Sequence, residues 1–284
     1  MNKPRLSIVI PTIRTHLLKD LYYSIEKSCN RHSFEVIFVG PFNVSEHLTI
    51  KNNVTYIKDY GQPSRAAQLG LLETKGELTC WITDDCWCYP ETLSNTLELY
   101  DCHCLDNDIV GMRFFENPDH YQAIKSGQTN NQNPPDRLKN HPDNYWFAST
   151  SYHSLIFKGV KSNWGTSCLF ITRTQLLKDF GGWDCQWEHL NHATHDLLFR
   201  LQQCGSRFFL TDYDVFVANW YQGTSKDHAP VHYGQLTHDE QLFTKVWTIQ
   251  NVRSRIDINN WQNVSEIWER RFTNGIVKNY ADLY

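Results

Sequence analysis

The chain has 284 residues, of which 40% are hydrophobic and 20% are charged, and its formal net charge is -4. A chain of this length can bury a large core, and the composition is that of a globular protein rather than a disordered or fibrous one. Because no block of lysine or arginine occurs, the electrostatic pattern of a nucleic-acid-binding protein is missing, and we expect no nucleic-acid partner.

The stretch MNKPRLSIVIPTIR contains an apolar run of about five residues, shorter than the core of a signal peptide (about 7–15) or a membrane-spanning helix (about 20). The nine cysteines are scattered, which fits free thiols in a reducing compartment. Two C-x-C pairs, at 86–88 and 102–104, are spaced more tightly than zinc-ligand pairs, so we interpret them as small apolar residues. We expect a cytoplasmic protein without a transmembrane segment, and peripheral membrane contact is left open.

Apolar runs alternate with helical patterns through the first hundred residues. The runs read as buried strands, and the helical segments repeat apolar residues three and four positions apart. This alternation predicts an α/β fold with a mostly parallel central sheet and helices on both faces, in which ligands bind at the carboxyl ends of the strands. The expected strands are 6–11, 34–40, 54–60 and 78–83, and the expected helices are 16–29, 64–75 and 90–100, the last opened by Pro90.

The second half is less regular. A polar segment at 117–164, rich in Asn, Pro and Asp, is interpreted as a long loop. Thr194 is the expected N-cap of a helix that ends at Gly205. The remaining expected elements are strands at 108–115, 165–173, 207–212 and 215–220, and a short helix at 174–180 closed by Gly181 and Gly182.

The character of the chain changes near Gln235, where a helical tail begins. Trp247, Trp261 and Trp268 are its large anchors, and they either pack back on the domain or make a subunit contact that would give a homo-oligomer. We therefore divide the chain into a main domain, residues 1–234, with halves 1–105 and 106–234, and a C-terminal helical extension, residues 235–284.

Asp84 and Asp85 stand together at the expected end of a buried strand. Adjacent carboxylates repel one another, and a fold tolerates them where a cation or a set of donors compensates. Mg²⁺ and Mn²⁺ favour carboxylate, phosphate and water oxygens, so a divalent metal is one interpretation. The alternative is that one of the two acids caps the following helix or sits in a turn.

Two further charged residues lie near expected helix starts. Arg65 is placed to contact a phosphate, because free N–H groups there attract anions, although a solvated surface arginine is the alternative. Asp196 is expected in the first turn of its helix, where a negative charge is favourable in itself, so a purely structural role is its alternative.

The order of these segments along the chain is more specific than any one segment alone. LSIVIPTIR, GQPSRAAQLGLLETKGELTCWITDDCWCYPETL, GTSCLFITRTQLLKDFGGWD and THDLLFRLQQCG together resemble the GT-A glycosyltransferases of the large inverting family two. That family has a strand ending in Pro-Thr, a Gly-Glu pair before a strand tipped with D-x-D or T-D-D, a Gly-Gly-aromatic-Asp turn and an E-D-x-x-L-x-x-R-L helix. The resemblance covers residues 5 to about 220 and implies a GT-A, Rossmann-like fold.

The resemblance implies a donor site in the first half of the chain and acceptor elements in the second. Pro11, Thr12 and Arg14 would flank the nucleobase and ribose of a nucleoside-diphosphate sugar, most simply a UDP-sugar, and Arg65 would face that donor. The acceptor would be a glycan or another hydroxyl compound.

The same resemblance gives roles to three acids. Asp84 would hold the ribose or support the metal, and Asp85 would bind Mn²⁺ or Mg²⁺ bridging the diphosphate. Asp196 resembles the general base. The metal would neutralise the leaving diphosphate while the base takes the proton of the attacking hydroxyl, which inverts the anomeric carbon.

The chain departs from the family pattern at several positions. Gly40 replaces the acid that usually ends the second strand and reads the base, and His195 replaces the Glu before the catalytic Asp, where it would contact acceptor or tune Asp196. The late metal-binding histidine has three candidate replacements, Asn219, His228 and His232. An acceptor-stacking platform, or an ordinary aromatic lining, is expected from Tyr145, Trp146, Tyr152, His153 and Trp164.

The sequence thus predicts a metal-dependent, inverting glycosyltransferase of the hexosyltransferase type with an Asp general base. A catalytically silent GT-A-like binding or scaffold protein is the alternative that Gly40 and His195 favour. A nucleotidyltransferase is a further alternative, but PTIRTH does not resemble the Gly-rich, basic phosphate loop that such enzymes need.

Overall fold

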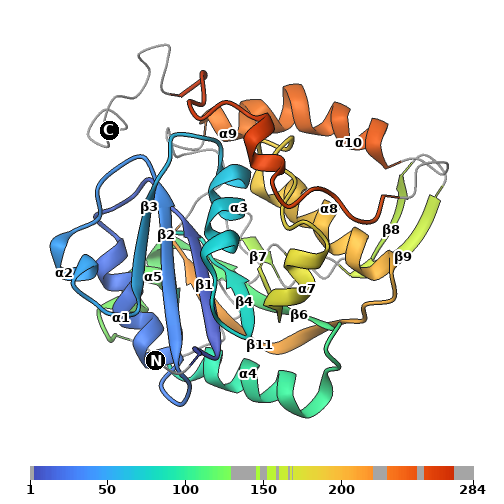
Figure 1. The fold of residues 1–284 in the computed structure, drawn as a ribbon. Helices are drawn as coiled ribbons and strands as arrows, with labels where there is room; N and C mark the ends of the chain where they lie inside the picture. The colour runs from blue at the N-terminus through green and yellow to red at the C-terminus, as the bar shows by residue number, and fades with distance from the viewer. Residues whose placement is uncertain are drawn as a thin grey trace.

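The computed structural model describes residues 3–128, 165, 167, 169–219, 230–247 and 253–271, together with the backbone of 145–147, 152–157, 160–164 and 229. Its centre is one nine-stranded sheet of order β3-β2-β1-β4-β10-β6-β11-β5, with β7 paired to β6 (Figure 1). The strands are β1 (Leu6–Pro11), β2 (Phe34–Gly40), β3 (Val54–Lys58), β4 (Leu78–Trp81), β5 (Cys86–Cys88), β6 (Ile109–Glu116), β7 (Tyr145–Phe147), β10 (Phe170–Arg173) and β11 (Phe208–Ala218). A separate hairpin joins β8 (Tyr152–Phe157) and β9 (Val160–Gly165).

The first four strands follow the sequence prediction closely. β1 pairs in parallel with β2 and with β4, and β2 pairs in parallel with β3. Leu6 lies opposite Phe34 on one side and Leu78 on the other. Continuous apolar runs form such strands because both faces of the sheet are covered.

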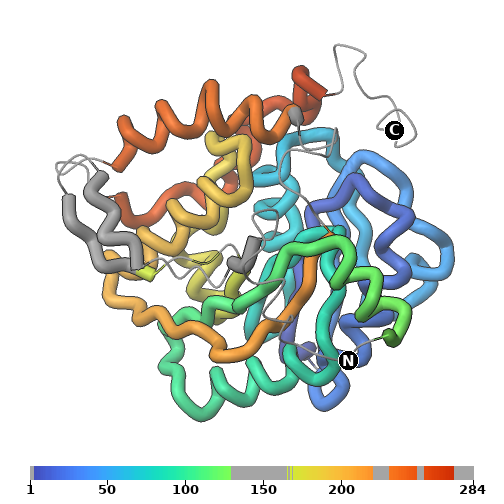
Figure 2. Tube along the Cα trace, turned by 180° about the vertical axis from the view of Figure 1, so that it is seen from behind, coloured from blue at the N-terminus to red at the C-terminus, as the bar shows by residue number. Residues whose placement is uncertain are grey.

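Helices cover both faces of the sheet, as the alternating pattern predicts (Figures 1 and 2). The main helices are α1 (Leu18–Ser28), α2 (Glu46–Thr49), α3 (Pro63–Glu73), α4 (Thr92–His103), α5 (Pro118–Lys125), α7 (Thr174–Asp179) and α8 (Leu190–Gln203). On one face α3 contacts α7 and α8, and on the other α1 contacts α4, while α5 lies against β5 and β11. The predicted α/β fold with a central sheet is confirmed, but the sheet is mixed rather than mostly parallel, because β5, β7 and β10 pair antiparallel with their neighbours.

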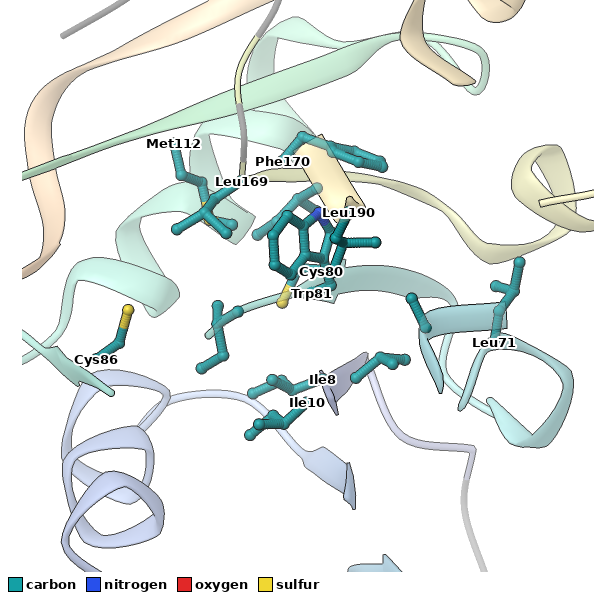
Figure 3. Packing of buried hydrophobic residues seen from close by; sticks show 14 of the residues in the cluster. Ile8, Ile10, Leu71, Cys80, Trp81, Cys86, Met112, Leu169, Phe170 and Leu190 are labelled. Atoms are coloured by element: carbon teal, nitrogen blue, oxygen red, sulfur yellow. The ribbon is translucent and has the colours of Figure 1, made fainter. Parts of the chain in front are cut away.

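The core runs between the sheet and α3, α7 and α8. Trp81 of β4 lies opposite Val9 of β1 and beside Leu190 at the start of α8, whereas Ile8 lies opposite Cys80 (Figure 3). Trp81 is 3% exposed and Leu190 is 6% exposed. The first residue of α8 is therefore fixed by apolar contact with the sheet, which sets where this helix meets the strand ends.

Several local predictions are wrong. Residues 118–125 form α5 rather than loop, because Asn117 caps this segment by accepting the His120 N–H at 2.7 Å and Pro118 suits the first helical position. The two strands expected at 207–212 and 215–220 are one strand, β11, with register shifts between Leu210 and Phe216. The strand expected at 165–173 is shorter, since Gly165 ends β9.

Helix α8 starts four residues before the predicted N-cap. His189, not Thr194, is its N-cap, and the His189 side chain accepts the Asn191 N–H. Helix α4 begins at Thr92 rather than Pro90, because β5 and a turn with Glu91 at φ 63° separate it from the two aspartates. Asp196 is therefore in the second turn of α8, and Asp84 is not the cap of α4.

The C-terminal part is helical only at first. It contains α9 (Ala229–Gly234), a π-helical turn (Gln235–Asp239) and α10 (Glu240–Val246), all near α8 in Figure 1. Residues 253–271 then return across the molecule with one short 3₁₀ turn, Asn260–Asn263. Trp247 and Trp268 are 8% and 7% exposed, so both pack on the main domain. In the parts of the chain that the structure describes, no helix is long and apolar enough to cross a membrane.

Candidate functional site

A cavity of about 240 Å³ lies at the carboxyl ends of the parallel strands. Pro11 of β1, Gly40 of β2, Asp85 after β4 and Glu116 of β6 line one side of it. The opposite side comes from the start of α8, from α9 and from the chain that follows, whose described residues 240–247 and 253–271 are called the C-terminal segment below. This is the position at which open α/β sheets bind ligands, and it brings together segments as far apart in the sequence as Pro11 and Arg271.

Asp84 organises the loop that joins β1 to α1. Its Oδ2 atom accepts hydrogen bonds from Thr12 Oγ1 at 3.1 Å and from the backbone N–H groups of Ile13 and Arg14, both at 2.9 Å. Its Oδ1 atom pairs with the Arg14 guanidinium. Burial alone would raise the pKa of Asp84, but the Arg14 charge and the two backbone donors hold this pKa below its usual value. The carboxylate is thus ionised, and it fixes the shape of one cavity wall.

Gly40 is required where the family pattern has an acid. A Cβ atom at this position would lie 1.9 Å from the Thr12 carbonyl oxygen, so no side chain fits without separating the ends of β1 and β2. The nearest acid along this edge is Asp59, which follows β3, lines the cavity and donates its N–H to the Gly40 carbonyl at 3.1 Å. Sequence reasoning missed Asp59, which it placed inside the expected strand 54–60, whereas β3 ends at Lys58.

Arg65 does not line the cavity. Its Nε atom donates to Asp59 Oδ1 at 3.0 Å and its Nη1 atom donates to the Trp261 carbonyl at 2.6 Å. The guanidinium also lies 5.0 Å from the centre of the Trp261 ring. In this arrangement Arg65 joins the end of β3 to the C-terminal segment, behind the wall that Asp59 forms.

Asp85 lies at the centre of the cavity wall. It is 5% exposed, and its Oδ2 atom is 3.7 Å from the Arg14 Nη1 atom, which is longer than a hydrogen bond. Its backbone carbonyl accepts the Asn219 N–H at 2.9 Å. The carboxylate therefore has an attractive charge nearby and no hydrogen-bond donor among the described side chains.

Glu116 is a cavity residue that sequence reasoning missed. It ends β6 directly opposite Ala218 of β11, and its Oε2 atom is buried without a hydrogen-bond partner among the described residues. Burial, together with the negative charge of Asp85, raises the pKa of Glu116 to about 9. The available signal was a carboxylate directly after the expected strand 108–115.

Asp196 lies in the interior, away from the cavity lining. Its Oδ2 atom accepts from Arg200 Nε at 2.8 Å, and its Oδ1 atom accepts from Trp247 Nε1 at 3.0 Å and from Arg253 Nη1 at 2.8 Å. The side chains of Asp196 and Arg200 are both 0% exposed. Both oxygens are therefore committed to donors, one of which, Arg253, also pairs with Asp184.

The spacing along α8 agrees with this placement. In the pattern E-D-x-x-L-x-x-R-L the acid precedes the arginine by six positions, and six positions before Arg200 the chain has Thr194. Asp196 precedes Arg200 by four positions, the spacing of an intrahelical ion pair. The geometry thus favours the structural alternative for Asp196.

The remaining candidates divide between the cavity and other places. His232 of α9 and His189 of α8 line the cavity, and their ring centroids are 6.1 Å apart. His195 instead stacks on Phe199 with centroids 6.4 Å apart, outside the lining. The Asn219 N–H is bonded to Asp85. His228 and the side chains of Tyr145, Trp146, Tyr152, His153 and Trp164 lie outside the described residues.

The C-terminal segment adds two residues to the cavity that the sequence did not indicate. Trp268 and Arg271 both line it, and the Trp268 N–H donates to the Tyr60 carbonyl at 2.9 Å. Arg271 brings a positive charge and is 3% exposed. Over the residues that are described, no three His, Cys, Asp or Glu side chains are arranged to hold a metal ion.

We expect Asp196→Asn to destabilise the fold. The change removes the charge that pairs with Arg200 and Arg253, and breaking a buried ion pair typically costs about 3–5 kcal/mol. Urea unfolding should show this loss, whereas Asp179→Asn, an exposed change at the end of α7, should show almost none. A variant Asp196→Asn that unfolds like the unchanged protein would contradict the structural assignment.

We also expect Gly40→Ala to lower the melting temperature. The added methyl group would contact the Thr12 carbonyl and push β1 and β2 apart at the cavity, a type of overpacking that costs about 1–3 kcal/mol. Gly127→Ala is the control, because that glycine has φ 74° but open space around it. A smaller loss for Gly40→Ala than for Gly127→Ala would show that the strand ends are not tightly apposed.

Comparison with known proteins supports the fold but not a family assignment. No protein-family model and no curated protein matches the sequence. The structure is similar to the crystal structure of S. aureus TarS 1–349, with a TM-score of 0.52 and 16% identity over 96% of this chain and 73% of that one. It is also similar to TarS 1–349 in complex with UDP, with a TM-score of 0.50 and the same identity and coverage. The chain thus has a GT-A-like α/β fold.

Proposed function

We propose that this protein is a glycosyltransferase that binds a nucleoside-diphosphate sugar, most simply a UDP-sugar, in the cavity at the strand ends. The observation that carries the proposal is the Asp84-held loop of Thr12–Arg14, which lies beside Asp85 in the lining of that cavity. A similar fold crystallised with UDP supports a uridine nucleotide as the donor. The order of the motifs along the chain supports the same reaction class.

The cavity has groups suited to each part of such a donor. The loop after β1 and the ends of β2 and β3 offer backbone groups and Asp59 to a base and ribose. Arg14 and Arg271 bring positive charge, which favours a diphosphate. Trp268 lies on the same lining, and its Nε1 atom has no hydrogen-bond partner among the described residues, so it can donate to a ligand.

Asp85 is the residue through which a Mg²⁺ or Mn²⁺ ion would be held. It fits this role because its carboxylate is buried, faces the cavity and accepts no side-chain hydrogen bond within the described chain. When bound, the cation would supply charge compensation for the departing diphosphate. Asp84 does not fit this role, since its oxygens are occupied by the loop.

Inverting transfer also requires a base near the acceptor. We propose that Asp196 is this base, on the condition that its present hydrogen-bond donors are displaced. Asp196 can take a proton only after Arg253 and Trp247, which belong to the C-terminal segment, move away from its Oδ1 atom. The occupied state of Asp196 favours a second candidate function, a nucleotide-binding protein of the same fold that does not transfer sugar.

The two candidates differ in a direct assay. Purified protein with UDP-glucose and Mn²⁺ should release UDP slowly by hydrolysis and faster with a suitable hydroxyl acceptor. A silent binding protein should bind UDP in calorimetry without releasing it from UDP-glucose. Absence of both UDP binding and UDP release, with a panel of nucleoside-diphosphate sugars, would contradict the proposed function.

We expect Asp84→Asn to weaken UDP binding at least about tenfold, or about 1.4 kcal/mol. The loss of charge releases Arg14, and the loop that forms one wall of the cavity no longer has its central acceptor. Asp106→Asn is the matched control, since its side chain is 89% exposed and distant from the cavity lining. Equal affinity of both variants for UDP would show that this wall does not contact the nucleotide.

A further inference from the structure

We infer that Glu116 and Asp85 together form a two-carboxylate site for a divalent cation in the nucleotide cavity. This inference rests on the proposed function, because the cation would lie beside the diphosphate of the donor. The family-like pair Asp84–Asp85 offers only one available carboxylate here, since Asp84 is bonded to Thr12, Ile13 and Arg14. The second carboxylate then comes from β6.

The backbone places the two acids on opposite sides of one strand. Glu116 lies opposite Ala218 in the parallel pairing of β6 with β11. Cys86 lies opposite the same Ala218 in the antiparallel pairing of β5 with β11, and the Asp85 carbonyl accepts the next N–H, that of Asn219. Neighbouring strands are about 4.8 Å apart, so the two backbones flank β11 at a separation of about 10 Å.

Both side chains reach from these positions into the same cavity. The two carboxylates therefore belong to one lining, on the two sides of β11.

The site lacks the donors that buried carboxylates normally have. Glu116 Oε2 has no hydrogen-bond partner in the described chain, and Asp85 has only the Arg14 contact at 3.7 Å. Arg14 is already engaged by Asp84. Burying carboxylates without donors is costly, and a divalent cation offsets that cost for both acids at once. Hard cations such as Mg²⁺ and Mn²⁺ are typically held by one or two carboxylates, with phosphate and water oxygens completing their shell.

The test is a Mn²⁺ titration of the full chain, followed by the electron paramagnetic resonance signal of free Mn²⁺, with and without UDP. The unchanged protein should bind one Mn²⁺ more tightly when UDP is present. Glu116→Gln and Asp85→Asn should each weaken Mn²⁺ binding at least tenfold. Asp119→Asn, an exposed acid three positions after Glu116, should bind Mn²⁺ as the unchanged protein does.

Misfolding is separable from loss of the site. Glu116→Gln keeps the shape of the side chain and removes no hydrogen bond from its Oε2 atom, so without Mn²⁺ its melting temperature should equal or exceed that of the unchanged protein. Addition of Mn²⁺ and UDP should raise the melting temperature of the unchanged protein more than that of Glu116→Gln.

The outcomes distinguish failure of the cation site from failure of the proposed function. Unaltered Mn²⁺ affinity in Glu116→Gln would overturn the inference and leave Glu116 as a neutral buried carboxyl group. Failure of the unchanged protein to bind Mn²⁺, while it still binds UDP, would also overturn the inference but not the nucleotide site. Glu116-dependent Mn²⁺ binding without any UDP binding would support the cation site and contradict the proposed function.

Discussion

The site depends on the hydrogen bonds and the ion pair by which Asp84 holds the loop after β1. One carboxylate accepts hydrogen bonds from Thr12 and from the backbone of Ile13 and Arg14, and it also pairs with the Arg14 guanidinium. Asp84 and Asp85, which follow β4, have different roles in the structure. Asp84 holds the neighbouring loop in place, which leaves Asp85 to face the cavity. Close apposition of Gly40 and Thr12 completes this wall.

The C-terminal segment is part of the same construction. Trp247 and Arg253 bond to Asp196, the carbonyl of Trp261 accepts from Arg65, and Trp268 lines the cavity. Hydrogen bonds and an ion pair thus connect the C-terminal segment to α8 and α3. Any movement of this segment would alter both the cavity lining and the donors on Asp196.

Local patterns sufficed to predict the parallel strands, since β1 to β4 are apolar runs whose character depends on burial alone. The loop-like composition of 117–164 concealed α5, whose Asn117 cap and Pro118 are short-range signals outweighed by the polar residues around them. Asp196 was assigned by likeness to a helix pattern, but its partners Trp247 and Arg253 are more than fifty positions away and no local rule indicates them. Glu116 was missed for the same reason: its environment is created by Asp85 and β11.

The central claim is that a sugar nucleotide lies in the cavity that the Asp84-held loop and Asp85 line. The most direct measurement is a crystal structure of the protein with UDP and Mn²⁺. The account predicts UDP density along Thr12–Arg14 with its phosphates toward Asp85. UDP bound elsewhere on the protein, with this cavity filled only by solvent, would contradict it.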